Sequence, residues 1–174
     1  LIIFLDVTEI FKAQNTILER NKELEKINNE MLLSNNALKF GEEIGGYGNW
    51  SWNIKENTWY FSDNLYKLLG AEPKSFESNL DNYYNYVHPE DVEYFKTVMA
   101  KMEEEENLPA FTYRILRPSG EILHVKGVGT PTYDSNGNKF LGGVVVNISE
   151  EVKRSQILQK AFEELKYYNE SSKE

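Results

Sequence analysis

Two histidines, His88 and His124, are the side chains best suited to proton transfer, because the chain contains no cysteine. A serine nucleophile needs a base such as histidine within hydrogen-bond reach. His88, however, precedes a proline at an expected helix start, and His124 alternates with Ile122 and Lys126 in an expected strand. These surroundings favour a helix-cap contact and a sheet-face position. We therefore predict no catalytic residue and no enzymatic activity for this chain itself.

The residues that could bind a cofactor or a metal form no convincing set. Without cysteine, thiolate metal sites and covalent cofactor attachment are excluded. Haem would need an axial ligand such as Met99 or Met102. Flavin would need aromatic rings to stack on, but the tryptophans have the spacing of strand residues, which core packing explains better. The acidic run Glu103–Glu106 lacks the loop that positions oxygens around calcium. We expect no metal, haem or flavin, and leave open a small organic ligand.

The charge of the chain argues against polyanionic partners. The sequence has 19 basic and 28 acidic side chains, a net charge of −9 and a pI near 4.9, so we expect neither nucleic acid nor membrane contact. The longest wholly apolar run, Leu1–Leu5, is far below the roughly 20 residues of a membrane-spanning helix. Because the sequence begins at Leu1, we interpret it as part of a longer protein. The lack of cysteine is compatible with the cytoplasm.

Hydrophobic periodicity and turn residues predict two strands, several helices and three further strands between two flanking helices. Pro89 and two acids after His88 indicate a helix start, and Phe95 and Met99 lie on the apolar face that follows. The expected strands cover residues 49–54, 58–61, 111–116, 122–132 and 140–148, and the expected helices cover 9–44, 65–69, part of 78–87, a segment from 89, and a terminal segment from 149.

The long N-terminal helix carries a seven-residue repeat. An apolar column alternates with a column of amides, which is typical of a two-stranded coiled coil whose buried asparagines fix the register. We therefore predict a parallel homodimer through this helix, with a solvated single helix as the alternative. The residues expected in the dimer seam are Ile10, Ile17, Asn21, Leu24, Asn28, Met31, Asn35 and Leu38.

The two ends of the sequence resemble each other. Asn147-Ile148-Ser149 lies 141 positions after Asp6-Val7-Thr8, and a helix follows in both places. The simplest interpretation is that residues 1–8 are the last strand of a preceding domain of the same type. The expected organisation is that strand, a linker helix over 9–44, one domain over 45–150 and an output helix over 151–174. Ser149 is expected to cap the output helix, and Asn147 to tie it to the sheet.

An ordered set of motifs over about 38–153 resembles the PAS domain family. The resemblance implies an α+β fold with a five-stranded antiparallel sheet, helices on one face, a pocket between them, and coiled-coil helices on either side. The motifs are Gly48-Asn49-Trp50-Ser51-Trp52-Asn53, Phe61-Ser62-Asp63-Asn64-Leu65-Tyr66-Lys67-Leu68-Leu69-Gly70, His88-Pro89-Glu90-Asp91, Tyr113-Arg114, Arg117-Pro118-Ser119-Gly120, Asp134-Ser135-Asn136-Gly137 and Asn147-Ile148-Ser149-Glu150.

The resemblance also implies where signals pass and where a ligand binds. The family's final motif is Asp-x-Thr, which Asp6 and Thr8 keep, whereas Asn147 and Ser149 replace it here; all four are candidate relay residues. At Asn147 a neutral contact would replace any ion pair. The expected pocket lies between the apolar helix face and the sheet, and its candidate lining residues are Trp52, Tyr66, Phe95, Met99, Tyr113 and Val128.

PAS domains commonly stand in tandem within larger signalling proteins. The resemblance therefore implies a regulatory module of a sensor histidine kinase, with adjacent PAS and kinase domains in the same chain as partners. Two alternatives stay open: a ligand-free dimerisation spacer, and a module of a cyclic-dinucleotide cyclase or phosphodiesterase. A flavin-binding redox or light sensor is a third reading, although the cysteine that forms the blue-light adduct is absent.

Overall fold

The computed structural model describes residues 7–105 and 109–171 of the 174-residue chain. Contacts divide the chain into two units, Leu1–Gly41 and Glu42–Glu174. Helix α1 spans Val7–Gly45, so the described part of the first unit is helix alone. The predicted long N-terminal helix is therefore present. None of the helices within the described residues has an apolar stretch long enough to cross a membrane.

Only the last two residues of the strand predicted for 1–8 are described, and both are helical. Val7 and Thr8 form the start of α1, while Asp6 and the rest of 1–6 lie outside the described residues. A strand needs a neighbouring strand to receive its backbone hydrogen bonds. The strand preference of β-branched residues is weak, and it does not decide the structure of Val7 and Thr8 here.

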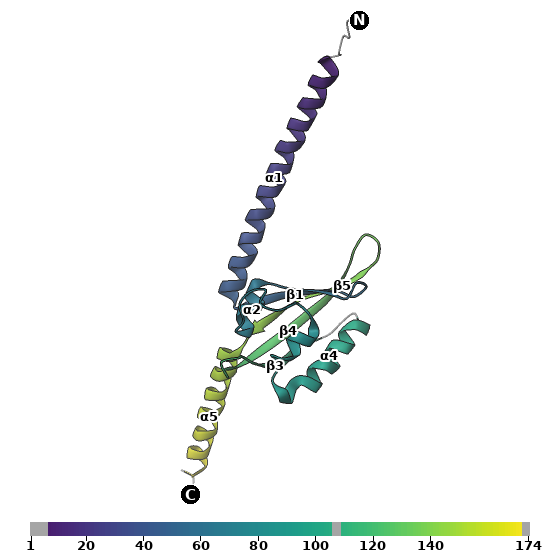
Figure 1. The fold of residues 1–174 in the computed structure, drawn as a ribbon. Coiled ribbons are helices and arrows are strands. Elements are labelled where there is room, and N and C mark those ends of the chain that lie inside the picture. The colour runs from purple at the N-terminus through teal and green to yellow at the C-terminus, as the bar shows by residue number, and fades with distance from the viewer. Residues whose placement is uncertain (1–6, 106–108, 172–174) are drawn as a thin grey trace, which may run out of the picture. The chain divides into compact units, whose positions relative to one another are not determined.

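The second unit is built on a five-stranded antiparallel sheet in the order β2-β1-β5-β4-β3 (Figure 1). The strands are β1 (Tyr47–Asn53), β2 (Thr58–Phe61), β3 (Phe111–Leu116), β4 (Ile122–Tyr133) and β5 (Lys139–Asn147). Each predicted strand of the domain is found within about two residues of its expected bounds, and β3 has the bounds expected. The predicted α+β class and five-stranded sheet are confirmed.

Helices α2 (Asp63–Leu69), α3 (Leu80–Tyr84) and α4 (Val92–Glu104) contribute to the core beside the sheet, and α5 (Ser149–Ser171) follows β5 (Figure 1). The side chain of Ser62 accepts the Leu65 N–H at the start of α2, and Gly70 ends that helix in the left-handed conformation. The predicted helix start at Pro89 is a 3-10 turn, Pro89–Asp91, and α4 begins immediately after it.

The core lies between the inward face of the sheet and these helices. Burial alternates along β1 and β3, as expected for strands with one covered face. Phe95, Met99 and Met102 of α4 are all buried, which confirms the apolar face expected for this helix. The strand residues in the core are Trp50, Trp52, Phe61, Phe111, Tyr113, Ile115, Leu123, Val125, Leu141 and Val145.

Candidate functional site

The start of α5 is bonded both to the sheet and to the turn that follows α1. The backbone N–H of His124 in β4 donates to the Ser149 hydroxyl at 2.9 Å, and the Asn147 N–H donates to the Gly46 carbonyl at 3.1 Å. The side-chain oxygen of Asn147 accepts the Ser149 N–H at 3.0 Å. We call Gly46, His124, Asn147 and Ser149 the helix joint. It links the segments on both sides of the domain through the sheet.

The structure exchanges the roles expected for Asn147 and Ser149. Asn147 provides the side-chain cap, because its amide oxygen accepts a backbone N–H at the helix start. Ser149 provides the tie to the sheet through His124. The physical reason is that β5 ends at Asn147 and α5 begins two residues later at Ser149, so the Asn147 side chain makes an Asx-type contact with the Ser149 N–H.

A buried polar cluster holds the end of α1 against the domain. Glu42 is only 5% exposed, and its carboxylate accepts a hydrogen bond from the Asn49 side chain. The Asn64 side chain donates to the Glu42 carbonyl at 3.0 Å. Lys67 pairs with Glu43 at 2.9 Å. Burying a carboxylate is unfavourable unless hydrogen bonds compensate, so this cluster holds the last turn of α1, which belongs to the second unit, on the rest of that unit. The sequence analysis did not identify it.

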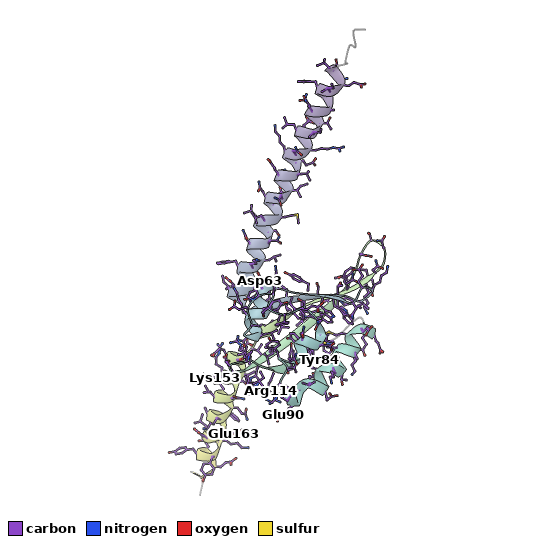
Figure 2. All side chains as sticks on the ribbon, in the orientation of Figure 1. Asp63, Tyr84, Glu90, Arg114, Lys153 and Glu163 are labelled. Atoms are coloured by element: carbon purple, nitrogen blue, oxygen red, sulfur yellow. The ribbon has the colours of Figure 1, made fainter. Side chains whose placement is uncertain are left out.

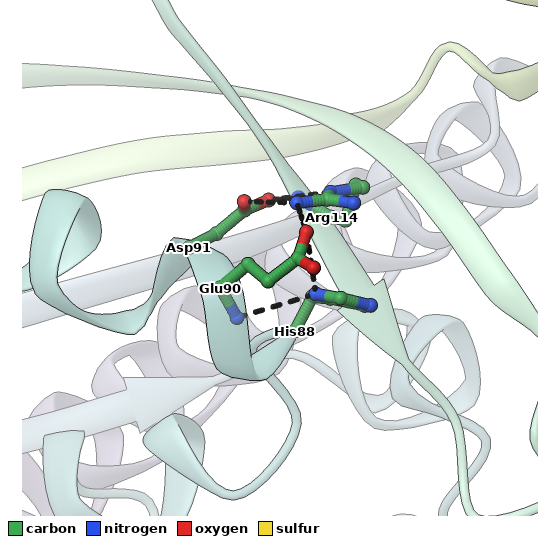
Figure 3. Close-up of polar contacts among 4 residues, drawn as sticks. All are labelled: His88, Glu90, Asp91 and Arg114. Atoms are coloured by element: carbon green, nitrogen blue, oxygen red, sulfur yellow. Dashed lines mark hydrogen bonds and ion pairs between the residues drawn. The ribbon is translucent and has the colours of Figure 1, made fainter.

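A second polar cluster joins the start of α4 to strand β3 (Figure 3). The Arg114 side chain donates to both carboxylate oxygens of Asp91, at 2.6 and 3.0 Å, and to Glu90 at 2.8 Å. The Arg114 backbone N–H donates to Asp91 at 2.8 Å. His88 lies beside Glu90 and accepts its backbone N–H at 3.3 Å. Figure 2 shows Glu90 and Arg114 near the start of α5, which carries Lys153.

The hydrogen bonds and charge of Arg114 lower the pKa of Asp91 below its usual value. Ionised Asp91 therefore stabilises the fold above the ordinary Asp pKa, near 3.9, and this contribution is lost as the pH falls through the lowered pKa. We expect Asp91→Asn to reduce the free energy of unfolding by about 1 kcal/mol at pH 7, and by less as the pH falls below about 4. Urea unfolding across this range measures both effects.

A matched control for Asp91→Asn is Glu93→Gln, which removes an exposed carboxylate that pairs with Lys96 on the same helix. It should change stability little at any pH, because exposed pairs contribute little. A stability difference between Asp91→Asn and wild type that stays constant down to pH 3 would contradict the assignment.

A small cavity lies between the sheet and helices α2, α3 and α4. Its volume is about 20 Å³, which is about the space of one water molecule. Of the residues predicted to line a pocket, Phe95, Met99 and Tyr113 do line it. The other lining residues are Trp50, Trp59, Phe61, Leu65, Leu80, Tyr83, Phe111, Gly127 and Val145.

Three residues predicted to line the pocket lie elsewhere. Trp52 is buried but stacks on Trp59, with ring centroids 4.8 Å apart, and the Tyr66 hydroxyl donates to the Phe76 carbonyl at 2.9 Å. Val128 does not line the cavity. The inward residues of β4 are Leu123, Val125 and Gly127, so the alternation places Val128 on the opposite face of the sheet.

Tyr83 supplies a polar contact in the cavity wall that the sequence analysis missed. Its hydroxyl lies 2.6 Å from that of Tyr113. Burial raises the pKa of both phenols well above the ordinary value, so both stay protonated at neutral pH. The remaining lining is aliphatic, aromatic or glycine, which suits only a small neutral molecule.

We expect the purified protein to be colourless above about 320 nm. The chain has no cysteine for covalent attachment, and Met99 and Met102 are packed in the core. An absorbance spectrum of the purified chain tests this prediction. A flavin or Soret band in stoichiometric amount would overturn it.

The residues of the predicted dimer seam lie on α1, where the apolar members are exposed. Their exposed fractions range from 45% for Ile10 to 63% for Leu24. Of the other candidate residues, Thr8 lies in the first turn of α1, and Asp6 lies outside the described residues. Glu106, the last residue of the acidic run Glu103–Glu106, also lies outside the described residues.

Comparison with known proteins places the domain in context. A family model described as the PAS fold matches residues 58–145. A sensory box histidine kinase/response regulator from Burkholderia thailandensis is similar with a TM-score of 0.58 and 20% identity, over 75% of this chain and 98% of that chain. A PAS domain from Colwellia psychrerythraea is similar with a TM-score of 0.50 and 16% identity, over 68% and 98%.

A third similar structure has a higher sequence identity. The N-terminal domain of a diguanylate cyclase with a PAS/PAC sensor, from Marinobacter aquaeolei, has a TM-score of 0.53 and 25% identity, over 60% of this chain and 97% of that chain. Comparison with curated proteins gave no match.

Proposed function

We propose that this chain, which belongs to the PAS family, is a regulatory module that passes a conformational change from α1 to α5 within a larger signalling protein. The observation that carries the proposal is the helix joint. Asn147 bonds to Gly46 and to the first residue of α5, and Ser149 bonds to the sheet. A displacement of the turn after α1 therefore acts on the start of α5 directly.

For the parent protein we propose a sensor histidine kinase of a two-component system, located in the cytoplasm. This proposal rests on the motif order in the sequence, with adjacent PAS and kinase domains as expected partners. The name of the similar Marinobacter domain supports a cyclic-dinucleotide enzyme as the alternative parent. In either case the chain itself is proposed to have no catalytic site, and no nucleic-acid or membrane partner.

A second candidate function is relay without any ligand. A cavity of about 20 Å³ has room for no organic molecule unless side chains move, and the two hydroxyls in its wall are already bonded to each other. These observations favour a ligand-free relay module over a ligand sensor. The competing proposal is a small neutral organic ligand, which native mass spectrometry of the purified chain would detect.

The proposed dimer uses the seam of α1. Its apolar residues are exposed, and the described part of the first unit contains no other element to cover them. Burying such a column against a second copy is a common way in which a long helix with a heptad repeat is stabilised. The asparagines at 21, 28 and 35 would then meet their counterparts and fix a parallel register.

Ser149→Ala tests the helix joint. The change removes the acceptor of the His124 N–H, so we expect a loss of about 1 kcal/mol in stability and a melting temperature lower by roughly 4 °C. The output of the full-length protein should change more than this stability loss explains. Ser155→Ala, on the exposed surface of the same helix, is the matched control. Normal output combined with the lower melting temperature would rule out the joint as a relay.

A further inference from the structure

Strand β3 is an edge of the sheet, and its outer rim is occupied by the segment that precedes α4. The Arg114 N–H donates to the Asp91 carboxylate at 2.8 Å, and the Arg114 carbonyl accepts the His88 N–H at 2.8 Å. Both backbone groups of Arg114 therefore point away from β4. The segment at 88–91 takes the place that another strand would have on this edge.

The residue paired with Arg114 holds the start of α5 in the same manner. Arg114 lies opposite His124 in the β3–β4 register. The His124 N–H donates to the Ser149 hydroxyl at 2.9 Å, and the His124 carbonyl accepts the Ile148 N–H at 2.9 Å. The backbone groups of His124 therefore point away from β3. Two helix starts are attached to opposite rims of one cross-strand pair.

Because the backbone groups of Arg114 and His124 point away from each other, the two residues form a non-hydrogen-bonded antiparallel pair. In such a pair the side chains lie close together on one face of the sheet. A groove of about 400 Å³ lies beside them, and its lining is Asp91, Thr112, Tyr113, Arg114, His124, Ile148 and Val152. The contacts of both helix starts thus converge within this single region of the sheet.

From this geometry we infer that the Arg114–His124 pair couples the start of α4 to the start of α5, and that Asp91 and Arg114 are positioning residues for the output helix. The inference rests on the proposed relay function and names the path that joins the core to the helix joint. Its starting point is α4, which contributes Phe95 and Met99 to the cavity wall.

The contacts around the pair are rigid enough to pass a shift of the start of α4 on to β3. Asp91 receives three hydrogen bonds from Arg114, two of them from the planar guanidinium, so the two residues are held in one relative orientation. The preceding segment is also fixed, because the Leu116 N–H donates to the Tyr86 carbonyl at 2.8 Å and Val87 bridges to Ile115. A shift at the start of α4 is therefore passed to β3.

Amide hydrogen exchange on the whole 174-residue chain tests the coupling. The reporter is the Val152 N–H, which donates to the Ile148 carbonyl at 2.9 Å in the first turn of α5. Its rate is compared with that of Leu141, a buried strand residue that corrects for global stability. We expect Asp91→Asn to raise this ratio about fivefold or more, as coupling between linked sites would.

The matched control is Glu121→Gln, which removes a carboxylate that pairs with Arg117 in the same hairpin and touches neither helix start. It should leave the ratio within about twofold of wild type. The same contacts act in the other direction, so Ser149→Ala should speed exchange of the Arg114 N–H relative to that of Leu141. Arg114→Lys replaces Asp91→Asn in this test if the latter does not fold. It keeps the charge but loses the planar guanidinium, so it should also raise the Val152 ratio.

An unchanged Val152 ratio in Asp91→Asn, or in Arg114→Lys where that variant replaces it, would overturn the inference. An equal rise in Glu121→Gln would also overturn it, because the effect would then be a general loosening of the hairpin. Failure of the relay function has a different signature. Exchange would show the coupling, while Ser149→Ala left the output of the full-length protein unchanged.

Discussion

Gly143→Ala is expected to destabilise the domain by about 3 kcal/mol, which would lower its melting temperature by roughly 10 °C. Gly143 lies in β5, opposite Gly129 of β4 and Trp50 of β1. A β-carbon at this position would overlap the carbonyl oxygen of Val128 and would lie 2.7 Å from the Trp50 ring. The backbone of a central strand cannot move away cheaply, so the strain reaches the wall of the cavity.

The neighbouring residue provides the control for this prediction. A β-carbon at Gly142 would meet no atom within 4 Å, and neither glycine has a positive φ that would penalise alanine. Gly142→Ala should therefore change stability by less than about 0.5 kcal/mol, or raise it slightly by restricting the unfolded chain. Thermal and urea unfolding of both variants measures the contrast. Similar losses in the two variants would show that strand glycines matter here for a reason other than close packing.

The helices and strands of the domain could be predicted from local sequence patterns, because their bounds depend on neighbouring residues. Ser62 and Gly70 bound α2 through a side-chain cap and a left-handed backbone, both of which depend only on residue type and spacing. The alternation in 111–116 likewise fixes which residues of β3 face inward. Val7 and Thr8 show the limit, since their residue types favour a strand and both are nevertheless in the first turn of α1.

Which residues of β4 point into the core could not be predicted in the same way. A shift of one residue turns every side chain to the other face, and nothing local in β4 distinguishes Val128 from Gly127 as the inward residue. Gly127 is inward because it pairs with Phe111. The choice between Trp50 and Trp52 at the cavity depends similarly on Trp59, which covers Trp52.

Contacts between distant residues account for the missed parts of the site. Asp91 and Arg114 are separated by 23 positions, and Asn147 reaches Gly46 across the domain. The sequence contains a usable signal for the first of these, because Arg114 alternates outward between buried residues of β3 while two acids open the preceding helix. No comparable signal points to Gly46, whose contribution is a backbone carbonyl.

Inserting one residue after Glu30 is expected to change the output of the full-length protein about fivefold or more, whereas inserting seven residues is expected to restore most of it. Each residue turns an α-helix by about 100°, so a single insertion rotates the seam residues beyond Glu30 out of the apolar column. Seven residues add two turns and leave the column within about 20° of its original direction. The relevant column contains Ile10, Ile17, Leu24, Met31 and Leu38.

The seven-residue insertion is the control for helix length, because it lengthens α1 more than the single insertion does while keeping the seam in phase. The same phase recurs at the other end, where Leu158 and Leu165 of α5 stand 141 positions after Ile17 and Leu24. Under the proposed dimer, both helices then present equivalent columns to their counterparts in the second copy. Equal output from the two insertions would exclude rotational coupling. Light scattering that finds a monomer at high concentration would exclude the seam itself.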